Sequence, residues 1–320
     1  DRYDRAGGLL IYGIPNFKLE KHVVERRIKL LKEGGIKFVN NFEVGKDSSL
    51  KELQSKHDAI LISTGVYKPR EVNLPGNDLS NIFPAMEFLT ASNKKGLGDK
   101  VEMFDNGTLN AEGKDVVVIG GGPCGSTAAN YLASLGHSTA LLDRAGRIKP
   151  CGGAIPPRAI IDFEIPDELL KAKVTTARMV SPTNRAVDIP IENGYVGMVD
   201  REEFDEFLRE RAAKKGATRF TGTFEKITRD TSGTIIHFRN HENRTVEQLK
   251  TRYIIGADGA RSNVAKAEIP DSDKIPYVIA YHEIIEAPEA TGKYDPERCD
   301  VIYDGIISPD FYGWVFPHGK

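Results

Sequence analysis

Four apolar residues that run into a glycine-rich turn constrain this chain more than any other feature. Val116–Ile119 predict a buried parallel strand, and the pattern Gly120-x-Gly122-x-x-Gly125 opens a predicted helix over residues 126–135. Gly120 permits a tight turn, Gly122 lets the backbone approach a pyrophosphate, and Gly125 lets helix and strand pack closely. The N-terminus of such a helix offers free N–H groups and a positive dipole end to phosphates. The segment therefore predicts a dinucleotide-binding strand–turn–helix.

Asp143 follows a second predicted strand, residues 138–142, at the spacing expected for a ligand of a ribose hydroxyl. Its carboxylate would repel a ribose 2′-phosphate, which favours FAD or NAD over NADP at this loop. The alternative is an ordinary strand–turn–helix with incidental glycines. Arg144 comes next and lies over the adenine or ribose in one interpretation, or is simply solvated in the other.

Composition narrows the class of protein. A chain of 320 residues is long enough for two domains, and its net charge of −2 gives no electrostatic case for nucleic acid. Cys124, Cys151 and Cys299 are too few and too scattered for a disulfide framework or a zinc site, so we expect no metal and a reducing compartment. No apolar run reaches the length of a membrane span and no signal peptide is visible. We expect a soluble intracellular protein.

The first third of the chain predicts an amphipathic helix within residues 17–32 that ends at Gly34-Gly35. The other elements expected there are a strand at 36–42, a buried strand at 58–64, a turn at 74–76, a short helix at 85–91 and a polar linker at 92–114.

Beyond Asp143, periodicity predicts a loop, a helix and a series of strands. The loop is expected at 147–157, the helix at 201–215, and strands at 218–222, 234–238 and 252–255. Further strands at 278–285, 300–303 and 312–316 indicate an antiparallel sheet near the end of the chain.

The first 113 residues resemble the small subunit of glutamate synthase. The resemblance is carried by Gly7-Gly8-Leu9-Leu10-x-Tyr12-Gly13-Ile14-Pro15, by Ser63-Thr64-Gly65 and by Pro75-Gly76. It implies FAD, NADPH and electron delivery to a large subunit. The family's flavin-binding glycine loop lies about twenty residues before the acidic residue that matches Asp1. This loop is absent from the sequence, so we expect the chain to begin inside a FAD domain and Gly7, Gly8 and Leu9 to be relics.

Residues 114–320 resemble geranylgeranyl reductases, flavoproteins that saturate prenyl double bonds. The shared motifs are Gly120-Gly121-Gly122-Pro123-x-Gly125, Lys149-Pro150-Cys151-Gly152-Gly153, Ile255-Gly256-Ala257-Asp258-Gly259 and Ser308-Pro309-Asp310-Phe311-Tyr312-Gly313-Trp314-Val315-Phe316-Pro317. Pro123 matches the reductases, whereas the glutamate synthase family has an acidic residue there. The family's later Gly-Asp motif, which holds the ribityl chain, is absent, so we expect truncation at this end as well.

The second resemblance assigns roles to individual residues. Arg201 matches a position that contacts the flavin, or is a first-turn helix residue. Asp258 and Gly259 contact the ribose or pyrophosphate side of FAD, or form a plain turn. Cys151 donates a proton to the saturated carbon, or merely shapes the pocket.

Three aromatic residues alternate along the last predicted strand and therefore project to one face: Tyr312, Trp314 and Phe316. They line a prenyl channel in one interpretation and form ordinary core in the other.

Together these patterns predict an α/β flavoprotein. It has a partial glutamate synthase-like region at 1–113 and, at 114–320, a Rossmann-like FAD-binding domain with a parallel sheet, followed by an antiparallel-sheet substrate region. The expected activity is NADPH-dependent, FAD-mediated reduction of a geranylgeranyl group in chlorophyll or isoprenoid biosynthesis. The alternatives are electron transfer to a glutamate synthase large subunit, or an inactive composite fragment. We expect a cytoplasmic location or peripheral contact with a photosynthetic membrane.

Overall fold

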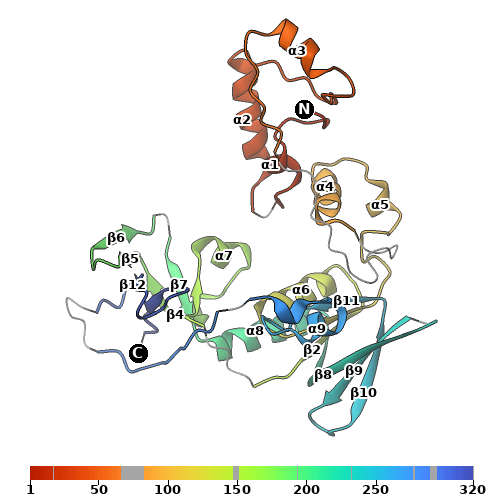
Figure 1. Ribbon diagram of the computed structural model, residues 1–320. Helices are drawn as coiled ribbons and strands as arrows, with labels where there is room; N and C mark the ends of the chain where they lie inside the picture. Colours follow the sequence, from red (N-terminus) through yellow and green to blue (C-terminus); the bar gives the residue numbers. More distant parts are fainter. Residues whose placement is uncertain are drawn as a thin grey trace. The chain divides into compact units, whose positions relative to one another are not determined.

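A computed structural model describes residues 1–16, 18–65, 83–146, 151–192, 194–231, 233–276, 278–288 and 294–319. The chain divides into two compact units, Asp1–Glu112 (unit 1) and Gly113–Lys320 (unit 2). Each unit is described separately, and Figure 1 follows the chain through both.

Unit 1 is helical in its described residues. Its helices are α1 (Leu9–Tyr12), α2 (Lys21–Glu33), α3 (Leu50–Lys56), α4 (Ala85–Gly96) and α5 (Glu102–Asp105). Ile11 and Tyr12 of α1 pack with Val24 of α2 in a small buried cluster. The expected amphipathic helix is therefore confirmed as α2, and the expected short helix as the start of α4.

Two predicted strands of unit 1 are wrong. Residues 36–42 and 58–65 form no strand, and every residue from 57 to 65 is exposed, with Leu61 at 91%. An apolar, β-branched sequence becomes a strand only when a neighbouring strand accepts its backbone hydrogen bonds. Within residues 1–16, 18–65 and 83–112 there is no such neighbour. These two segments have the composition of strands, but the described part of unit 1 provides no neighbouring strand with which they could pair.

The predicted linker at 92–114 is also partly wrong, because it contains the end of α4 and all of α5. Lys95 donates to Asp105 across this pair of helices at 2.5 Å, and Asn110 donates to the Phe104 carbonyl. These local contacts order a polar stretch that has few apolar residues. The predicted turn at 74–76 lies outside the described residues.

Unit 2 is built on a six-stranded sheet in the order β10-β9-β8-β2-β1-β11. The strands are β1 (Val116–Ile119), β2 (Thr139–Asp143), β8 (Thr218–Asp230), β9 (Gly233–Asn240), β10 (Val246–Thr251) and β11 (Tyr253–Gly256). β1 lies between β2 and β11, parallel to both, and β8 is parallel to β2. This succession of parallel strands is that of a dinucleotide-binding sheet, so the predicted fold class is confirmed.

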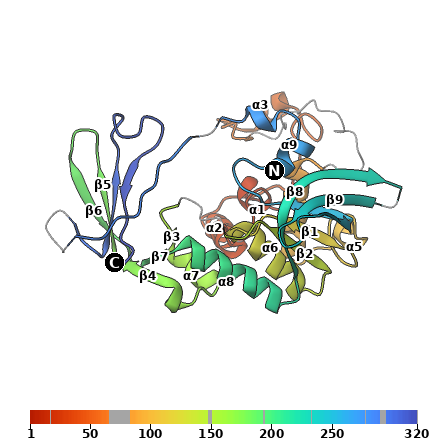
Figure 2. The same ribbon diagram turned by 90° about the horizontal axis from the view of Figure 1, so that it is seen from below.

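Helices cover the parallel strands. α6 (Pro123–Ser134) packs on β1 and β2, α8 (Arg201–Lys214) packs against α6 and β8, and α9 (Asn263–Glu268) packs against β8. Figure 2 shows α6 and α8 side by side next to β1 and β2. All four residues of β1 are at most 3% exposed, as expected for a strand buried on both faces.

Two smaller sheets lie at the end of unit 2 away from the β8–β10 strands (Figures 1 and 2). One has the order β13-β12-β5-β6 and the other β3-β7-β4. Their strands are β3 (Ala154–Ile155), β4 (Leu170–Val174), β5 (Thr176–Val180), β6 (Ala186–Pro190), β7 (Val196–Val199), β12 (Arg298–Ile302) and β13 (Gly313–Val315). α7 (Pro157–Asp162) and the short 3₁₀ turns Asp167–Leu169 and Ser272–Lys274 complete the unit.

The antiparallel-sheet prediction needs two corrections. β12 pairs in parallel with β5, although its pairing with β13 is antiparallel. The described residues 278–285 form no strand, and Ile279 is 85% exposed. β12 instead takes its neighbour from β5, more than a hundred residues earlier in the chain, a pairing that local periodicity does not encode.

We expect backbone amides of residues 60–62 to exchange with deuterium far faster than those of Val117 and Val118, because only the latter lie in a hydrogen-bonded, buried sheet. Hydrogen exchange with mass spectrometry on the intact chain measures both segments at once. Equal protection in the two segments would contradict the absence of a strand at 58–65.

Candidate functional site

The glycine turn after β1 is held by contacts too close for any side chain. Gly120 has φ +112°, and a Cβ there would lie 2.3 Å from the Ala257 carbonyl oxygen. A Cβ on Gly125 would lie 1.9 Å from the Gly120 carbonyl oxygen. Gly122 caps α6, and Pro123 occupies its first turn, where a missing N–H costs nothing. The turn, the helix start and residue 257 therefore form one tightly packed element.

The second predicted motif lies directly beside this turn. Gly256 pairs with Ile119 at the end of the parallel sheet, and Ala257 donates its N–H to the Ile119 carbonyl at 2.7 Å. Asp258 accepts the Ser262 hydroxyl and the N–H groups of Asn263 and Val264. Its carboxylate thus stabilises the start of α9.

Gly259 follows in the left-handed region at φ +93°, with open space where a Cβ would project. The structure brings the 256–259 segment to the glycine turn. Whether Asp258 and Gly259 contact a ligand stays a prediction.

Asp143, at the end of β2, faces the glycine turn. One carboxylate oxygen accepts the Gly121 N–H at 2.7 Å and the other accepts the Ala145 N–H at 2.9 Å. The Arg209 guanidinium lies 3.3 Å from the second oxygen. Arg144 is exposed, in keeping with either of its two interpretations.

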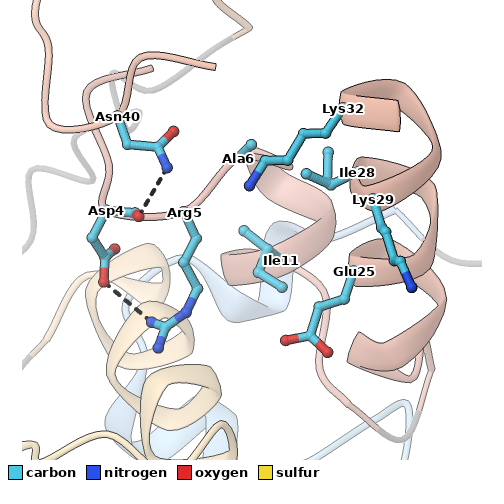
Figure 3. A pocket seen from close by; sticks show the side chains of 9 residues that line it. All are labelled: Asp4, Arg5, Ala6, Ile11, Glu25, Ile28, Lys29, Lys32 and Asn40. Carbon is cyan, nitrogen blue, oxygen red and sulfur yellow. Dashed lines mark hydrogen bonds and ion pairs between the residues drawn. The ribbon is translucent and has the colours of Figure 1, made fainter. Parts of the chain in front are cut away.

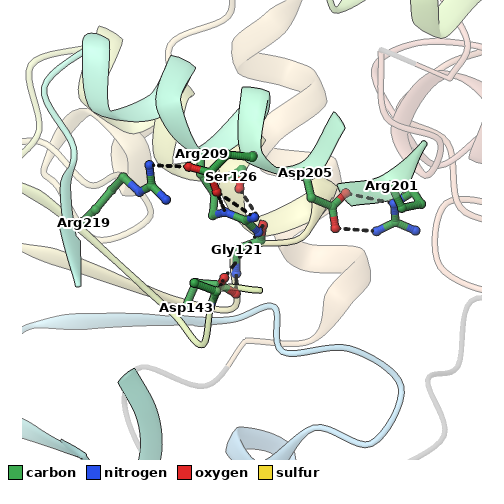
Figure 4. Close-up of polar contacts among 9 residues, drawn as sticks. Gly121, Ser126, Asp143, Arg201, Asp205, Arg209 and Arg219 are labelled. Carbon is green, nitrogen blue, oxygen red and sulfur yellow. Dashed lines mark hydrogen bonds and ion pairs between the residues drawn. The ribbon is translucent and has the colours of Figure 1, made fainter. Parts of the chain in front are cut away.

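Gly121 and Arg209 were missed by reasoning from sequence. A Cβ on Gly121 would lie 2.6 Å from the Asp143 Cγ and 2.9 Å from the Arg209 Cδ, so this middle glycine is required by its neighbours. Figure 4 shows the guanidinium reaching the Gly121 carbonyl, which also accepts the Ser126 hydroxyl at 3.0 Å. The run of three glycines was the one available signal, whereas nothing in the sequence pairs Arg209 with a loop so distant along the chain.

A cavity of about 510 Å³ opens beside the start of α6. Its wall combines apolar side chains with two thiols and two guanidinium groups, and includes Pro123, Cys124, Cys151, Ile155, Arg201, Phe204, Leu208 and Arg211. Such a lining suits a largely apolar group that carries a few acceptors.

Arg201 is the most strongly held cation of this wall. Its guanidinium makes a two-pronged ion pair with Asp205 at 2.8 and 2.9 Å (Figure 4), and the Asp205 side chain is only 5% exposed. Burial opposes the charge, but the hydrogen bonds to Asp205 and to the Cys151 thiol outweigh it and raise the pKa of Arg201. Cys151 itself is exposed. The structure therefore brings the predicted residues 151 and 201 together at the cavity.

The three predicted aromatic residues lie on one face but not on the cavity wall. The Tyr312 and Trp314 ring centres are 6.2 Å apart, and those of Trp314 and Phe316 are 6.4 Å apart. Phe316 covers Gly152, where a Cβ would lie 2.6 Å from its ring, and packs against a buried cluster around Met198. Their substrate role stays a prediction, and Phe316 also serves as core.

His318 was also missed. One of its ring nitrogens lies 3.1 Å from the Gly152 carbonyl oxygen and the other 3.2 Å from the Asp200 carboxylate. It ties the segment after β13 to the loop that carries Cys151.

Unit 1 has a cavity of about 400 Å³ between its first residues, α1 and α2 (Figure 3). Arg5 on its wall pairs with Asp99 through two contacts of 2.6 Å, and Asn40 donates to the Asp4 carbonyl. A Cβ on Gly7 would lie 3.0 Å from a methyl group of Val24. Gly7 of the first motif therefore has a packing role within unit 1.

We expect Gly125→Ala to destabilise unit 2 by about 1–3 kcal/mol, because the added methyl group overlaps the Gly120 carbonyl. Urea unfolding of the two proteins measures the difference. Gly305→Ala is the matched control, since a Cβ at Gly305 meets open space. Equal stability of the Gly125 variant and the parent would contradict the close packing.

Residues 114–272 match the FAD binding domain family, and residues 12–155 match the pyridine nucleotide-disulphide oxidoreductase family. The two matches overlap at the strand–turn–helix. Among the described residues, no helix is long and apolar enough to cross a membrane.

Two sets of relatives stand out. Geranylgeranyl diphosphate reductase of Rhodobacter capsulatus is 64% identical over 206 residues, which are 64% of this chain and 52% of that protein. The small chain of NADPH-dependent glutamate synthase from Azospirillum brasilense is 62% identical over 122 residues, 38% of this chain and 25% of that protein. The chain thus spans about half the length of the reductase and about a quarter of the length of the glutamate synthase small chain.

A solved structure of a geranylgeranyl bacteriochlorophyll reductase-like protein from Thermoplasma acidophilum aligns with a TM-score of 0.54 at 26% identity, covering 65% of this chain and 54% of that one.

The predicted cofactors, FAD and NADPH, agree with the matched families and relatives. The chain joins a segment similar to the glutamate synthase small chain to a longer segment similar to geranylgeranyl diphosphate reductases.

Proposed function

We propose that unit 2 binds FAD and, with NADPH as electron donor, reduces carbon–carbon double bonds of a geranylgeranyl group. The observation that carries this proposal is the meeting of three elements within one unit. The glycine turn, the 256–259 segment and a cavity that contains Cys151 all adjoin the start of α6. We place the boundary of this FAD-dependent region between residues 113 and 114, next to the division of the chain into units.

The residues present fit the ADP half of FAD. Gly120 and Gly125 keep side chains away from the turn, and the twelve-residue helix α6 presents its positive end there. Asp143 offers carboxylate oxygens to ribose hydroxyls. When bound, the flavin supplies the hydride chemistry of the reaction.

The other cavity residues have separate roles in this proposal. Arg201, fixed by Asp205, would donate a hydrogen bond to a flavin held at the cavity. Cys151, within hydrogen-bonding reach of that guanidinium, donates the proton that the saturated carbon needs. Apolar side chains such as Phe204 and Leu208 exclude water. We place the enzyme in the cytoplasm or at the surface of a photosynthetic membrane, in keeping with plant relatives named as chloroplastic.

Electron transfer from NADPH to a glutamate synthase large subunit is the second candidate, favoured by the similarity to the small chain. It is the weaker one, because unit 1 forms no sheet within its described residues and the glycine turn is followed by Pro123. An inactive composite is the third. Reduction of artificial acceptors together with co-purification of a large partner favours the second candidate, and absence of flavin favours the third.

The test begins with the visible spectrum of the intact chain after incubation with excess FAD and desalting. We expect flavin bands at close to one equivalent, and NADPH oxidation that depends on geranylgeranyl diphosphate. A colourless protein would contradict the proposal.

Cys151→Ala separates proton donation from cofactor binding. We expect it to retain FAD but to slow prenyl reduction on the order of 10²–10⁴-fold, the usual contribution of a general acid. Cys124→Ala is the matched control, because it removes the other thiol of the same cavity. Full activity of the Cys151 variant would exclude the proton-donor role.

A further inference from the structure

We propose that Arg209 is a positioning residue for the adenosine ribose of FAD, acting through Asp143 and the Gly121 carbonyl. This inference rests on the proposed FAD function of unit 2. It concerns a residue of α8 that is not among the residues lining the cavity and that contacts the Gly121 carbonyl and Asp143.

Arg209 is buried, with 9% of its surface exposed, and its guanidinium is aimed at the loop. Nη1 donates to the Gly121 carbonyl at 3.1 Å and lies 3.3 Å from Asp143 Oδ1. Nε donates to Glu206 Oε2 at 2.8 Å. A buried cation without partners is costly, so these acceptors determine where the guanidinium lies.

Glu206, which accepts from Arg209, also pairs with a second arginine. Arg219 of β8 contacts the other oxygen of Glu206 at 2.8 Å. Burial acts to raise the pKa of Glu206, but the hydrogen bonds from Arg219 and Arg209 outweigh it and lower that pKa. The result is a chain of alternating charges. It runs from Arg219 of β8 through Glu206 and Arg209 of α8 to Asp143 at the end of β2.

The contacts of Asp143 leave room for one more donor. An ionised carboxylate accepts about four hydrogen bonds. The N–H groups of Gly121 and Ala145 account for two, and the Arg209 guanidinium, which forms an ion pair with Oδ1 at 3.3 Å, occupies the third position. A ribose hydroxyl would supply the fourth. Arg209 forms an ion pair with the oxygen that also accepts from Ala145, so it determines which acceptor position stays open to the ligand.

This arrangement assigns the chemical group that Arg209 serves, the vicinal diol of an adenosine ribose. It also explains why Gly121 has no side chain, since a Cβ there would meet both Asp143 and Arg209.

The experiment compares the intact parent chain with Arg209→Met, Arg209→Lys, Asp143→Asn and the double variant Arg209→Met with Asp143→Asn. FAD affinity is measured by flavin fluorescence, and ADP and 2′,3′-dideoxy-ADP compete for the site. Arg239→Met is the control, because it removes a guanidinium of the same unit that pairs with Glu225 on the β8–β9 strands.

We expect Arg209→Met to weaken FAD and ADP binding about tenfold, to leave dideoxy-ADP binding unchanged, and to add little in the Asp143→Asn background, as for coupled neighbours. Arg209→Lys is expected to restore part of the affinity, and Arg239→Met to retain the affinity of the parent. Circular dichroism checks folding. If Arg209→Met does not fold, the affinities of Arg209→Lys for ADP and for dideoxy-ADP are compared instead.

Parent-like FAD affinity in Arg209→Met would overturn the inference. Equal losses for ADP and dideoxy-ADP, or full additivity with Asp143→Asn, would overturn it as well, because both indicate general support of the fold. Failure of the parent chain to bind FAD is a different result, seen before any variant is made, and it overturns the proposed function itself.

Discussion

Close backbone contact at the end of β1 is the constraint on which unit 2 depends. The carbonyl of Gly120 occupies the space that a side chain at Gly125 would need, and the carbonyl of Ala257 occupies the space at Gly120. These contacts bring the end of β11, the glycine turn after β1 and the start of α6 into one packed element. Any ligand at the turn meets a rigid surface of backbone groups, which is what a pyrophosphate requires. The cavity that contains Cys151 starts from the same helix end.

A second level of organisation comes from buried charge. Arg201 pairs with Asp205 and Arg209 with Glu206 and Asp143, so one helix, α8, presents two fixed guanidinium groups to different parts of the candidate site. Their positions are specific because unpaired charge in such surroundings is costly. In this way α8 relates the cavity to Asp143 and the glycine turn, although it contributes nothing to the sequence motif of the turn.

Several elements were predictable from local sequence. The strand at Val116–Ile119, helix α6 and helix α8 lie within a few residues of their expected positions, because each combines an apolar pattern with a clear start or stop signal. The strands expected at 36–42, 58–64 and 278–285 do not form in the described residues. Those segments have the right composition, but strand formation depends on a partner elsewhere in the chain. The pairing of β12 with β5 shows the reverse case, in which a distant partner sets the topology.

The sequence by itself determined the dinucleotide-binding turn, the acidic residue at the end of β2 and the joint resemblance to two flavoprotein families. It did so because spacing over some thirty residues is a local property of one strand–turn–helix–strand unit. The tertiary structure alone decided that Gly121 must lack a side chain, that Arg209 contacts Asp143 and that Phe316 packs over Gly152. Each of these contacts joins residues far apart in the chain, and only the packing of sheets and helices sets such distances.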